Sequence, residues 1–305
     1  METLTARAAA AAWAVCAAAF AWYAAAVASE VTYVTLADGR RQERSLPLVF
    51  KMLLPFVGNL DRLVSRPAFA EQIAKAQETL VAAGFEGLLN GREFVELKLL
   101  VPLVFGTLWS LLVLALGAAM PGSPFDGAAL PISALGIAFA YLRPMLWLRG
   151  ALRRRHFAIM KALPFVLDLL TLSVEAGMDF ISALQRNCAL RRLDPLNEEL
   201  LRMTKEIQVG SSRAEALRNM ADRCRQPDLK SVAFALIQAD ELGVSIGSIL
   251  RIQSEQLRNR RFERAEKLAN EAPTKMLGPL MLCIFPAVFI ILLGPVLMQA
   301  LKDLF

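Results

Sequence analysis

The sequence predicts an all-α, polytopic membrane protein with about four transmembrane helices and one six-helix cytosolic bundle. Two observations predict this fold. Hydrophobic residues make up 56% of the 305 residues and the mean hydropathy is +0.44, whereas globular chains contain about 45–50% apolar residues. Three glycines (Gly177, Gly210 and Gly243) stand 33 residues apart, each seven residues before a leucine. Glycine suits the left-handed turn that ends a helix, and an apolar residue two turns later faces the core.

The apolar residues are concentrated in segments long enough to cross a membrane. No charged side chain occurs in residues 8–28, 99–120 and 276–301, and each segment meets the roughly 20-residue requirement for a spanning helix. A fourth segment, 128–148, is interrupted near its end by Arg143, whose guanidinium can reach the interface along its aliphatic stem. The expected membrane parts are an N-terminal helix at 1–28, a hairpin at 99–148 and a C-terminal helix at 276–305.

The distribution of Lys and Arg predicts the orientation of these spans. The loop 121–127 has no basic residue, whereas nine basic residues fall within 29–98 and an arginine cluster follows the third span. We therefore expect a cytoplasmic or interfacial helical segment at 29–98, a cytosolic six-helix domain at 149–275, and both termini outside. The alternative is a signal peptide cleaved after Ala28, which would place both polar regions outside. The charge asymmetry favours the uncleaved helix.

The segment 29–98 divides into short elements. Prolines and scattered charges break its apolar part, which favours a helix lying on the inner leaflet over a crossing helix. In order, we expect a turn at 35–41, the interfacial helix at 46–64, an amphipathic helix at 68–83 closed by Gly84, and the start of the second span at 91–98.

Six helices are expected in the cytosolic domain, at 156–176, 179–190, 195–208, 212–224, 228–242 and 246–271. The three glycines end the first, third and fifth helices, and Asp179, Ser211 and Ser245 are placed to cap the helices that follow. Asp194 and Pro195 suit the start of the third helix, as cap and first helical residue. The sixth helix is long and basic, and it runs toward the last span.

The first and third glycine turns match beyond the glycine itself. Glu, Gly, a bulky apolar residue, Ser and Leu recur at equal offsets in Glu175–Leu184 and Glu241–Leu250. This match predicts an internally pseudo-symmetric bundle. A 33-residue period is also typical of α-solenoids such as tetratricopeptide arrays, but their Trp, Tyr and Pro landmarks are absent here.

These phrases resemble the type II secretion F domain, the platform family of type II secretion and type IV pilus machines. The resemblance covers about residue 163 to the C-terminus. It rests on Leu163-Pro164-Phe165-Val166-Leu167-Asp168-Leu169-Leu170 and on Asp240-Glu241-Leu242-Gly243. The closing runs are similar to the TadC branch of tight-adherence pili: Gly278-Pro279-Leu280, Phe285-Pro286-Ala287 and Leu293-Gly294-Pro295.

The resemblance implies a non-enzymatic scaffold in the bacterial inner membrane. Such a protein would couple a cytosolic hexameric secretion ATPase to pilin extraction and polymerisation. The implied partners are the ATPase, the pilin and a TadB-like paralogous platform protein, with assembly into homo- or hetero-oligomers. Nucleic acid is not an expected partner, because the basic residues are mixed with acids and lack interleaved aromatics.

Two sets of charged residues are candidate contacts for partners. Glu175 and Glu241 are either a symmetric contact or ion site, or ordinary solvated turn carboxylates, and the second interpretation is favoured. The arginine cluster can fix the topology, meet anionic lipid headgroups and contact the ATPase. The basic candidates are Arg149, Arg153, Arg154, Arg155, Arg258 and Arg261.

Pro279, Pro286 and Pro295 would kink the last span. Such kinks are tolerated where neighbouring helices cover the freed backbone, so these prolines predict packing against partner helices.

No catalytic, cofactor or metal site is expected. The chain has four cysteines without a C-x-x-C pair and a single histidine, His156. The alternatives from other classes are an intramembrane enzyme or transporter, and a scaffold unrelated to pili. An enzyme or transporter usually needs ionisable groups within the bilayer, and the predicted spans contain no Asp or Glu.

Overall fold

The computed structural model describes residues 33–35, 41–43, 46–57, 64–119 and 129–304. The first predicted span, the loop 121–127 and most of the predicted turn at 35–41 lie outside these residues. The described residues are mainly helical, as predicted, with one short antiparallel strand pair among them, in which Val34 lies opposite Gln42. The strands of this pair are β1 (Tyr33–Thr35) and β2 (Arg41–Glu43).

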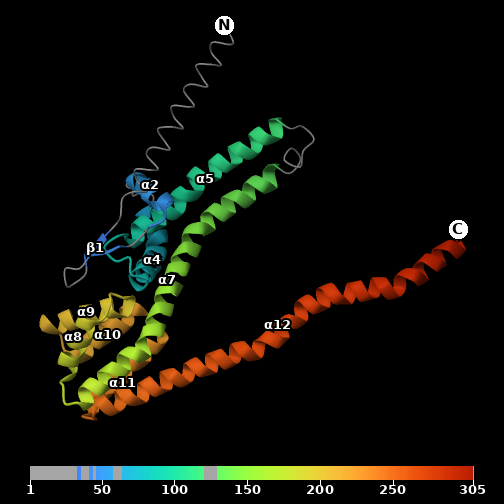
Figure 1. Cartoon of the computed structure of the whole chain (residues 1–305). Helices are drawn as coiled ribbons and strands as arrows, with labels where there is room; N and C mark the ends of the chain where they lie inside the picture. Colours follow the sequence, from blue (N-terminus) through green and yellow to red (C-terminus); the bar gives the residue numbers. More distant parts are fainter. Residues whose placement is uncertain (1–32, 36–40, 44–45, 58–63, 120–128, 305) are drawn as a thin grey trace, which may run out of the picture.

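A first hydrophobic core forms near one end of a helical hairpin, whose two long helices lie side by side in Figure 1. It joins α2 (Leu48–Val57), η2 (Pro67–Phe69), α4 (Ala70–Ala83), α5 (Gly91–Ala119) and the N-terminal half of α7 (Ala129–Glu175). The helix α2 occupies part of the expected interfacial helix and buries Phe50 and Leu53 against this core. Gly84 ends α4 with φ of 81°, as its position predicts.

The helices α5 and α7 form the hairpin expected from the apolar runs. The indole nitrogen of Trp109 donates a hydrogen bond to the carbonyl of Ile132 at 3.2 Å. Gly136 permits this close approach, because a Cβ there would lie 2.1 Å from Trp109 Cδ1. Within the described residues, three helices are long and apolar enough to cross a membrane: α5, α7 and α12.

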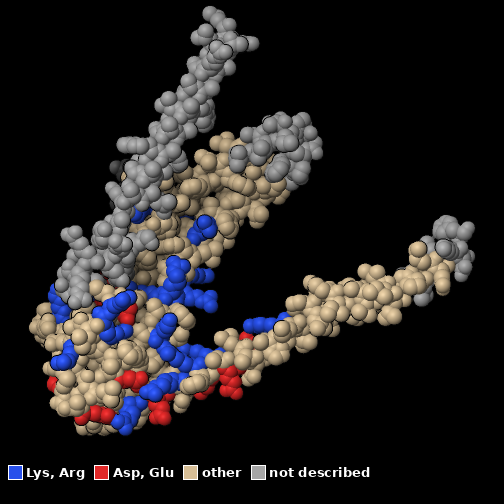
Figure 2. Space-filling view, in the orientation of Figure 1, with Lys and Arg blue, Asp and Glu red and all other residues tan. Residues whose placement is uncertain are grey.

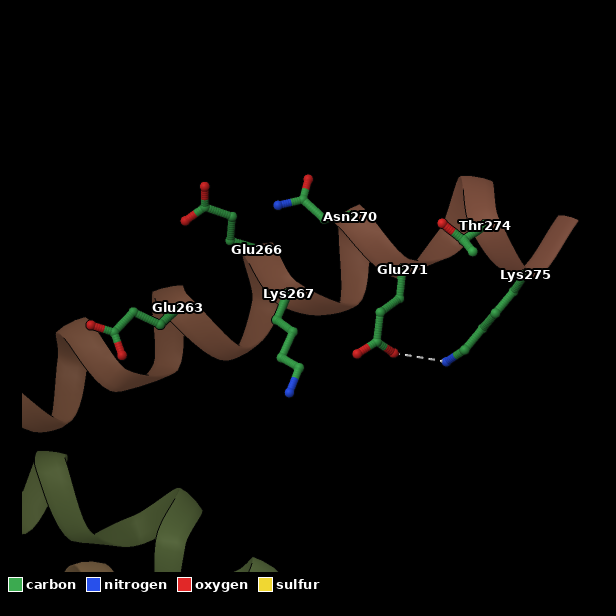
Figure 3. A pocket seen from close by; sticks show the side chains of 7 residues that line it. All are labelled: Glu263, Glu266, Lys267, Asn270, Glu271, Thr274 and Lys275. Carbon is green, nitrogen blue, oxygen red and sulfur yellow. Dashed lines mark hydrogen bonds and ion pairs between the residues drawn. The ribbon is translucent and has the colours of Figure 1, made fainter. Parts of the chain in front are cut away.

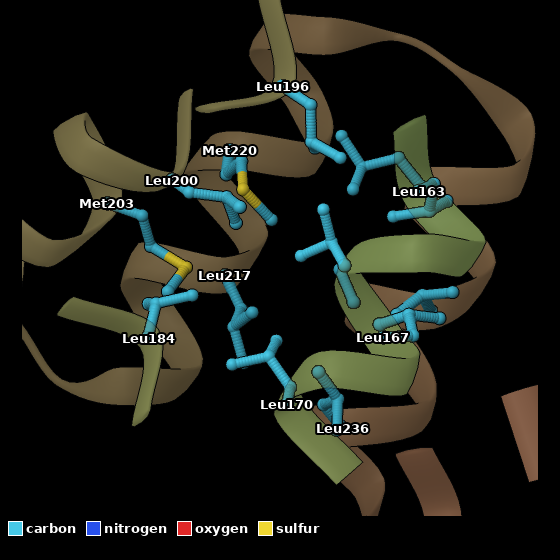
Figure 4. Close-up of a cluster of buried hydrophobic side chains, with 14 of the residues drawn as sticks. Leu163, Leu167, Leu170, Leu184, Leu196, Leu200, Met203, Leu217, Met220 and Leu236 are labelled. Atoms are coloured by element: carbon cyan, nitrogen blue, oxygen red, sulfur yellow. The ribbon is translucent and has the colours of Figure 1, made fainter. Parts of the chain in front are cut away.

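A second core lies in a bundle that we call the helical domain: the C-terminal half of α7, four short helices, and the first turns of α12. Leucines of α7 face those of the short helices across this core (Figure 4). The leucine seven residues after each glycine is buried there, with Leu184, Leu217 and Leu250 at most 2% exposed. The remaining helices are α8 (Phe180–Leu190), α9 (Pro195–Gln208), α10 (Arg213–Cys224), α11 (Pro227–Leu242) and α12 (Ile246–Leu304).

Two helices join the helical domain to the membrane part without a break. The predicted domain boundaries at 148/149 and 275/276 fall inside α7 and α12 rather than in loops. Leu148 and Ala151 of α7 belong to the first core, whereas Ile159 and Leu163 of the same helix belong to the second. The helix α7 therefore contributes residues to both cores and forms one arm between the helical domain and the membrane part. The helix α12 leaves the domain as a second, separate arm (Figure 1).

Candidate functional site at the root of the membrane helices

The three glycine turns share one hydrogen-bond pattern. Gly177, Gly210 and Gly243 have φ of 90°, 112° and 65°. After each glycine, the next amide donates to the carbonyl five residues back, at 3.0–3.1 Å. This is the Schellman arrangement that satisfies the last carbonyls of a helix. The side chains of Asp179 and Ser212 cap the helices after the first two turns, so the expected cap at Ser211 is displaced by one residue.

Glu175 lies at the junction of the first and third turns, where it pairs with Arg251 of α12 at 2.7 Å. The two side chains are 36% and 67% exposed, so the pair contributes little to stability. Glu241, its counterpart in sequence, is exposed, and the neighbouring Asp240 pairs with Arg213 at 3.1 Å.

A set of polar contacts fastens α12 to the helical domain, and we call it the α12 clamp. Its centre is Asp228 in the first turn of α11, whose side chain is 6% exposed. Arg264 donates to both carboxylate oxygens at 3.3 and 3.0 Å, and Arg260 donates to one at 3.1 Å. Burial raises the pKa of Asp228, but the hydrogen bonds and charges of Arg264 and then Arg260 outweigh it and hold the pKa below its usual range.

The α12 clamp continues along α7. Arg258 donates to the carboxylate of Asp168 at 2.7 Å, and the hydroxyl of Ser254 bonds to the same oxygen. Arg261 donates to the backbone carbonyls of Met160 and Lys161. The structure therefore gives both arginines that were candidate partner contacts on α12 an internal role.

A second network, the buried charge chain, links α7, α9 and α10. Arg155 of α7 is 6% exposed and pairs with Glu198 at 3.0 Å and with Glu199 at 2.7 Å. The chain of pairs runs on through Arg223 and Glu206, and it reaches the surface at the exposed pair between Arg202 and Glu86, in the turn after α4. It ties the helical domain to the first core.

The position of Arg155 corrects the grouping of four membrane-facing arginines. Residues 148, 151, 155 and 159 share the buried side of α7, so Arg155 points into the protein. Arg149, Arg153 and Arg154 are exposed. Many Lys and Arg side chains gather where the apolar arms meet the helical domain (Figure 2). These three arginines remain available to lipid or a partner.

His156 lies beside the buried charge chain. Its Nε2 is 2.8 Å from the carbonyl of Cys224, an arrangement in which the nitrogen donates. Burial lowers the pKa of His156, the hydrogen bond to Cys224 opposes this, and the charge of Arg155 lowers it further. The net pKa lies below the usual value, so the imidazole is neutral near pH 7.

Between the helical domain and its apolar span, α12 has an exposed polar segment, residues 263–275, that we call the stem. All from this one helix, the side chains of Glu263, Glu266, Lys267, Asn270 and Lys275 are exposed (Figure 3). Glu271 pairs with Lys275 at 3.0 Å along the helix.

The three prolines expected to pack against partner helices lie farther along α12. Pro279, Pro286 and Pro295 are exposed, and the helix continues through all of them. None of the most hydrophobic stretch of α12 is buried within the described structure. This part of the protein is therefore available to lipid or to other helices.

The described residues contain no cluster of three or more His, Cys, Asp and Glu that could hold a metal ion. Burial raises the pKa of the Cys188 thiol to about 11 and raises that of Cys224 further still. Both thiols are therefore protonated and poorly reactive near neutral pH.

Sequence reasoning missed the buried charge chain and the α12 clamp, although one signal was present. Glu199 lies between Leu196, Leu200 and Met203, on the apolar side of α9. An acid at such a position requires a buried cation. The identity of that cation is not readable from local spacing, because Arg155 is 44 residues away.

Comparison with known proteins agrees with the resemblance at the level of the domain. Residues 166–294 match the family model described as Type II secretion system (T2SS), protein F. No match was found among curated proteins or among solved structures. The matched residues begin in the buried half of α7 and end within the apolar span of α12. The match to this family therefore covers most of the helical domain and the arm that leaves it as far as residue 294.

Proposed function

We propose that this protein is a non-enzymatic platform protein of a type II secretion or type IV pilus machine, in the bacterial inner membrane. The helical domain faces the cytoplasm, where a hexameric secretion ATPase engages it. Displacement of the domain moves the attached spans, and this motion drives pilin extraction and polymerisation. Within this class, the closing Gly-Pro runs favour the TadC branch, working beside a TadB-like paralogue.

One observation carries the proposal: the two arms are rooted in one rigid domain. Both α7 and α12 run from the second core into apolar spans without a loop. The α12 clamp and the Leu250 and Leu257 side chains fix α12 against α7 and α11. A continuous helix transmits displacement, whereas a flexible linker would absorb it. The arrangement therefore suits a mechanical part better than a catalytic one.

The exposed stem and the exposed Arg149, Arg153 and Arg154 of α7 are the surfaces that we assign to partners. They flank the two points at which the arms leave the domain. A contact there would act on both arms close to the membrane, where a small rotation of the domain gives a lateral movement of the spans.

The direct test is deletion of the gene from a piliated host, followed by complementation. Loss of surface pili, restored by the wild-type protein, is expected, and normal pili in the deletion strain would overturn the proposal. Copurification of a secretion ATPase with the wild-type protein separates a pilus platform from an unrelated scaffold.

The stem provides a sharper test of the mechanism. Ala269→Gly with Asn270→Gly adds backbone freedom at two solvated positions, whereas Asn270→Ala preserves the helix. The glycine variant should bind the ATPase normally but assemble few pili, and the alanine variant should behave like the wild type. Normal piliation with the glycine variant would exclude α12 as a rigid lever.

Cysteine labelling tests on which side of the membrane the helical domain lies. Arg218 is exposed on α10, and the native thiols of the helical domain are buried with raised pKa values. Arg218→Cys should therefore react with a membrane-impermeant maleimide in inverted membrane vesicles and stay unlabelled in intact cells. Labelling in intact cells would place the domain away from any cytosolic motor.

A further inference from the structure

An apolar groove of about 1040 Å³ runs along the membrane hairpin, between α2, α5 and α7. Its walls include Phe105 and Trp109 of α5 and Leu135 and Phe139 of α7, all more than 40% exposed. In a bilayer, apolar side chains that face such a groove must meet acyl chains or another apolar surface, since water is absent there.

Among the described residues, Arg143 is the only charged one that lines this groove. Its guanidinium lies 5.6 Å from the centre of the Phe139 ring, and among the described residues no carboxylate forms an ion pair with it. A guanidinium presents several donors that match a phosphate, and one within an apolar wall is costly without an anion. The groove therefore favours a ligand with an apolar body and an anionic end.

The ends of the groove differ in character. At the end nearest the helical domain, Arg143 lies close to Trp147, whose ring packs edge-on against Phe50 of α2 at 4.9 Å. The other end is formed by Trp109 and Ile132. Both ends carry a tryptophan, but only one carries a cation. Cationic groups belong at the membrane interface, so the Arg143 end of the groove lies at the interface beside the helical domain.

The length of the groove matches one leaflet. Arg143 and Ile132 are eleven residues apart on α7, which corresponds to about 16 Å along a helix. Half of a hydrocarbon core about 30 Å thick is about 15 Å. A spanning helix of a partner would need both leaflets, whereas an acyl chain needs one.

We propose that this groove is a binding site for an anionic phospholipid of the leaflet next to the helical domain. Arg143 binds the phosphate, and an acyl chain lies along Phe139, Leu135 and Trp109. The inference rests on the membrane hairpin and not on the proposed role in secretion.

The test uses Trp109 as a reporter in reconstituted vesicles. Trp13, Trp22 and Trp147 are replaced by Phe, and quenching of Trp109 is measured with phospholipids brominated in the middle of the chain. At equal mole fractions, brominated phosphatidylglycerol should bind beside Trp109 about fivefold more strongly than brominated phosphatidylcholine. Arg143→Gln should abolish this preference.

Lys98→Gln is the matched control. Lys98 lies 4.8 Å from the Tyr141 ring and is not among the residues that line the groove, so its loss should leave the preference unchanged. Thermal unfolding of each variant verifies the fold, and Arg143→Lys should keep part of the preference.

Three results would overturn the proposal. Equal quenching by both lipids would mean that the groove holds bulk lipid without selection. Absence of quenching would mean that a protein segment fills it. Loss of the preference in 10 mM inorganic phosphate, at constant ionic strength, would indicate a site for free anions.

Discussion

Asp228, in the first turn of α11, accepts hydrogen bonds at both carboxylate oxygens from Arg264 of α12, 36 residues later in the chain. Its side chain is almost fully buried, while that of Arg264 is about half exposed. The helix that leaves the domain for the membrane is thus held at its root by a carboxylate that has little contact with water.

Asp228→Asn keeps the shape of this contact but removes its charge. We expect a loss of about 2 kcal/mol in the free energy of unfolding at pH 7, because two arginines lose their buried counterion. Denaturant unfolding of the purified protein in detergent measures it. Asp222→Asn, at an exposed pair with Lys230, should change stability by less than about 0.5 kcal/mol.

The stability difference between the wild type and Asp228→Asn should depend on pH in the acidic range. The folded-state pKa of Asp228 lies below the ordinary value of 3.8, so its stabilisation is complete above that pH and is lost as the pH falls through the folded pKa. The stability difference between wild type and Asp228→Asn should stay constant from about pH 8 to 5 and shrink below about pH 4. A difference that shrank already near pH 6 would contradict the assignment.

Arg155→Ala should destabilise the protein by about 3 kcal/mol, because Glu198 and the buried Glu199 each lose an ion pair with its guanidinium. Arg155→Lys should recover part of this loss, since an ammonium cannot span two carboxylates as a guanidinium does. Thermal unfolding in detergent provides the measurement. Arg153→Ala, two residues away and exposed, serves as the control and should have an effect within about 0.5 kcal/mol.

Two glycines near the start of α12 should respond to alanine with opposite signs. Gly243 has φ of 65°, so Gly243→Ala should cost about 1 kcal/mol of stability through backbone strain. Gly247 is helical, and an added Cβ would meet Val174 at 3.5 Å and Glu175 at 3.6 Å, which are ordinary contacts. Gly247→Ala should therefore stabilise by about 0.5 kcal/mol. Equal effects of the two changes in denaturant unfolding would refute this distinction.

The partly buried imidazole of His156 should make the stability of the protein depend on pH in a second range, closer to neutral. Its folded-state pKa is lowered below 6.5, so the unfolded state binds a proton first as the pH falls. Stability should be unaffected above about pH 7 and should decrease as the pH falls below about 6.5. His156→Gln, which retains a donor for the Cys224 carbonyl, should remove that decrease in a pH series of thermal unfolding.

The helix ends were readable from sequence because their causes are local. A left-handed glycine, a capping Asp and a Pro in the first turn act within a few residues, and the bounds of α8, α9 and α11 follow the prediction to within one residue. The ion pairs were not readable in this way. Asp168 and Arg258 are 90 residues apart, and only the packing of α12 on α7 brings them together.

The short β1–β2 pair was missed for a related reason. Three-residue strands carry too little alternation to distinguish them from a turn. The role of Arg155 was obscured by its neighbours, since three of the four arginines do face outward and the charge count alone treats them alike.

The sharing of α7 between two cores has a consequence for biogenesis. Among the described residues, the last that packs in the first core is Leu152, so this core can close while the rest of the chain is still being synthesised. The second core stays incomplete until Leu250 and Leu257 emerge, at the beginning of the helix that provides the last span. Insertion of that final span therefore coincides with closure of the domain that holds it, and a ribosome stalled shortly before residue 250 would leave the nascent chain anchored but unable to finish folding.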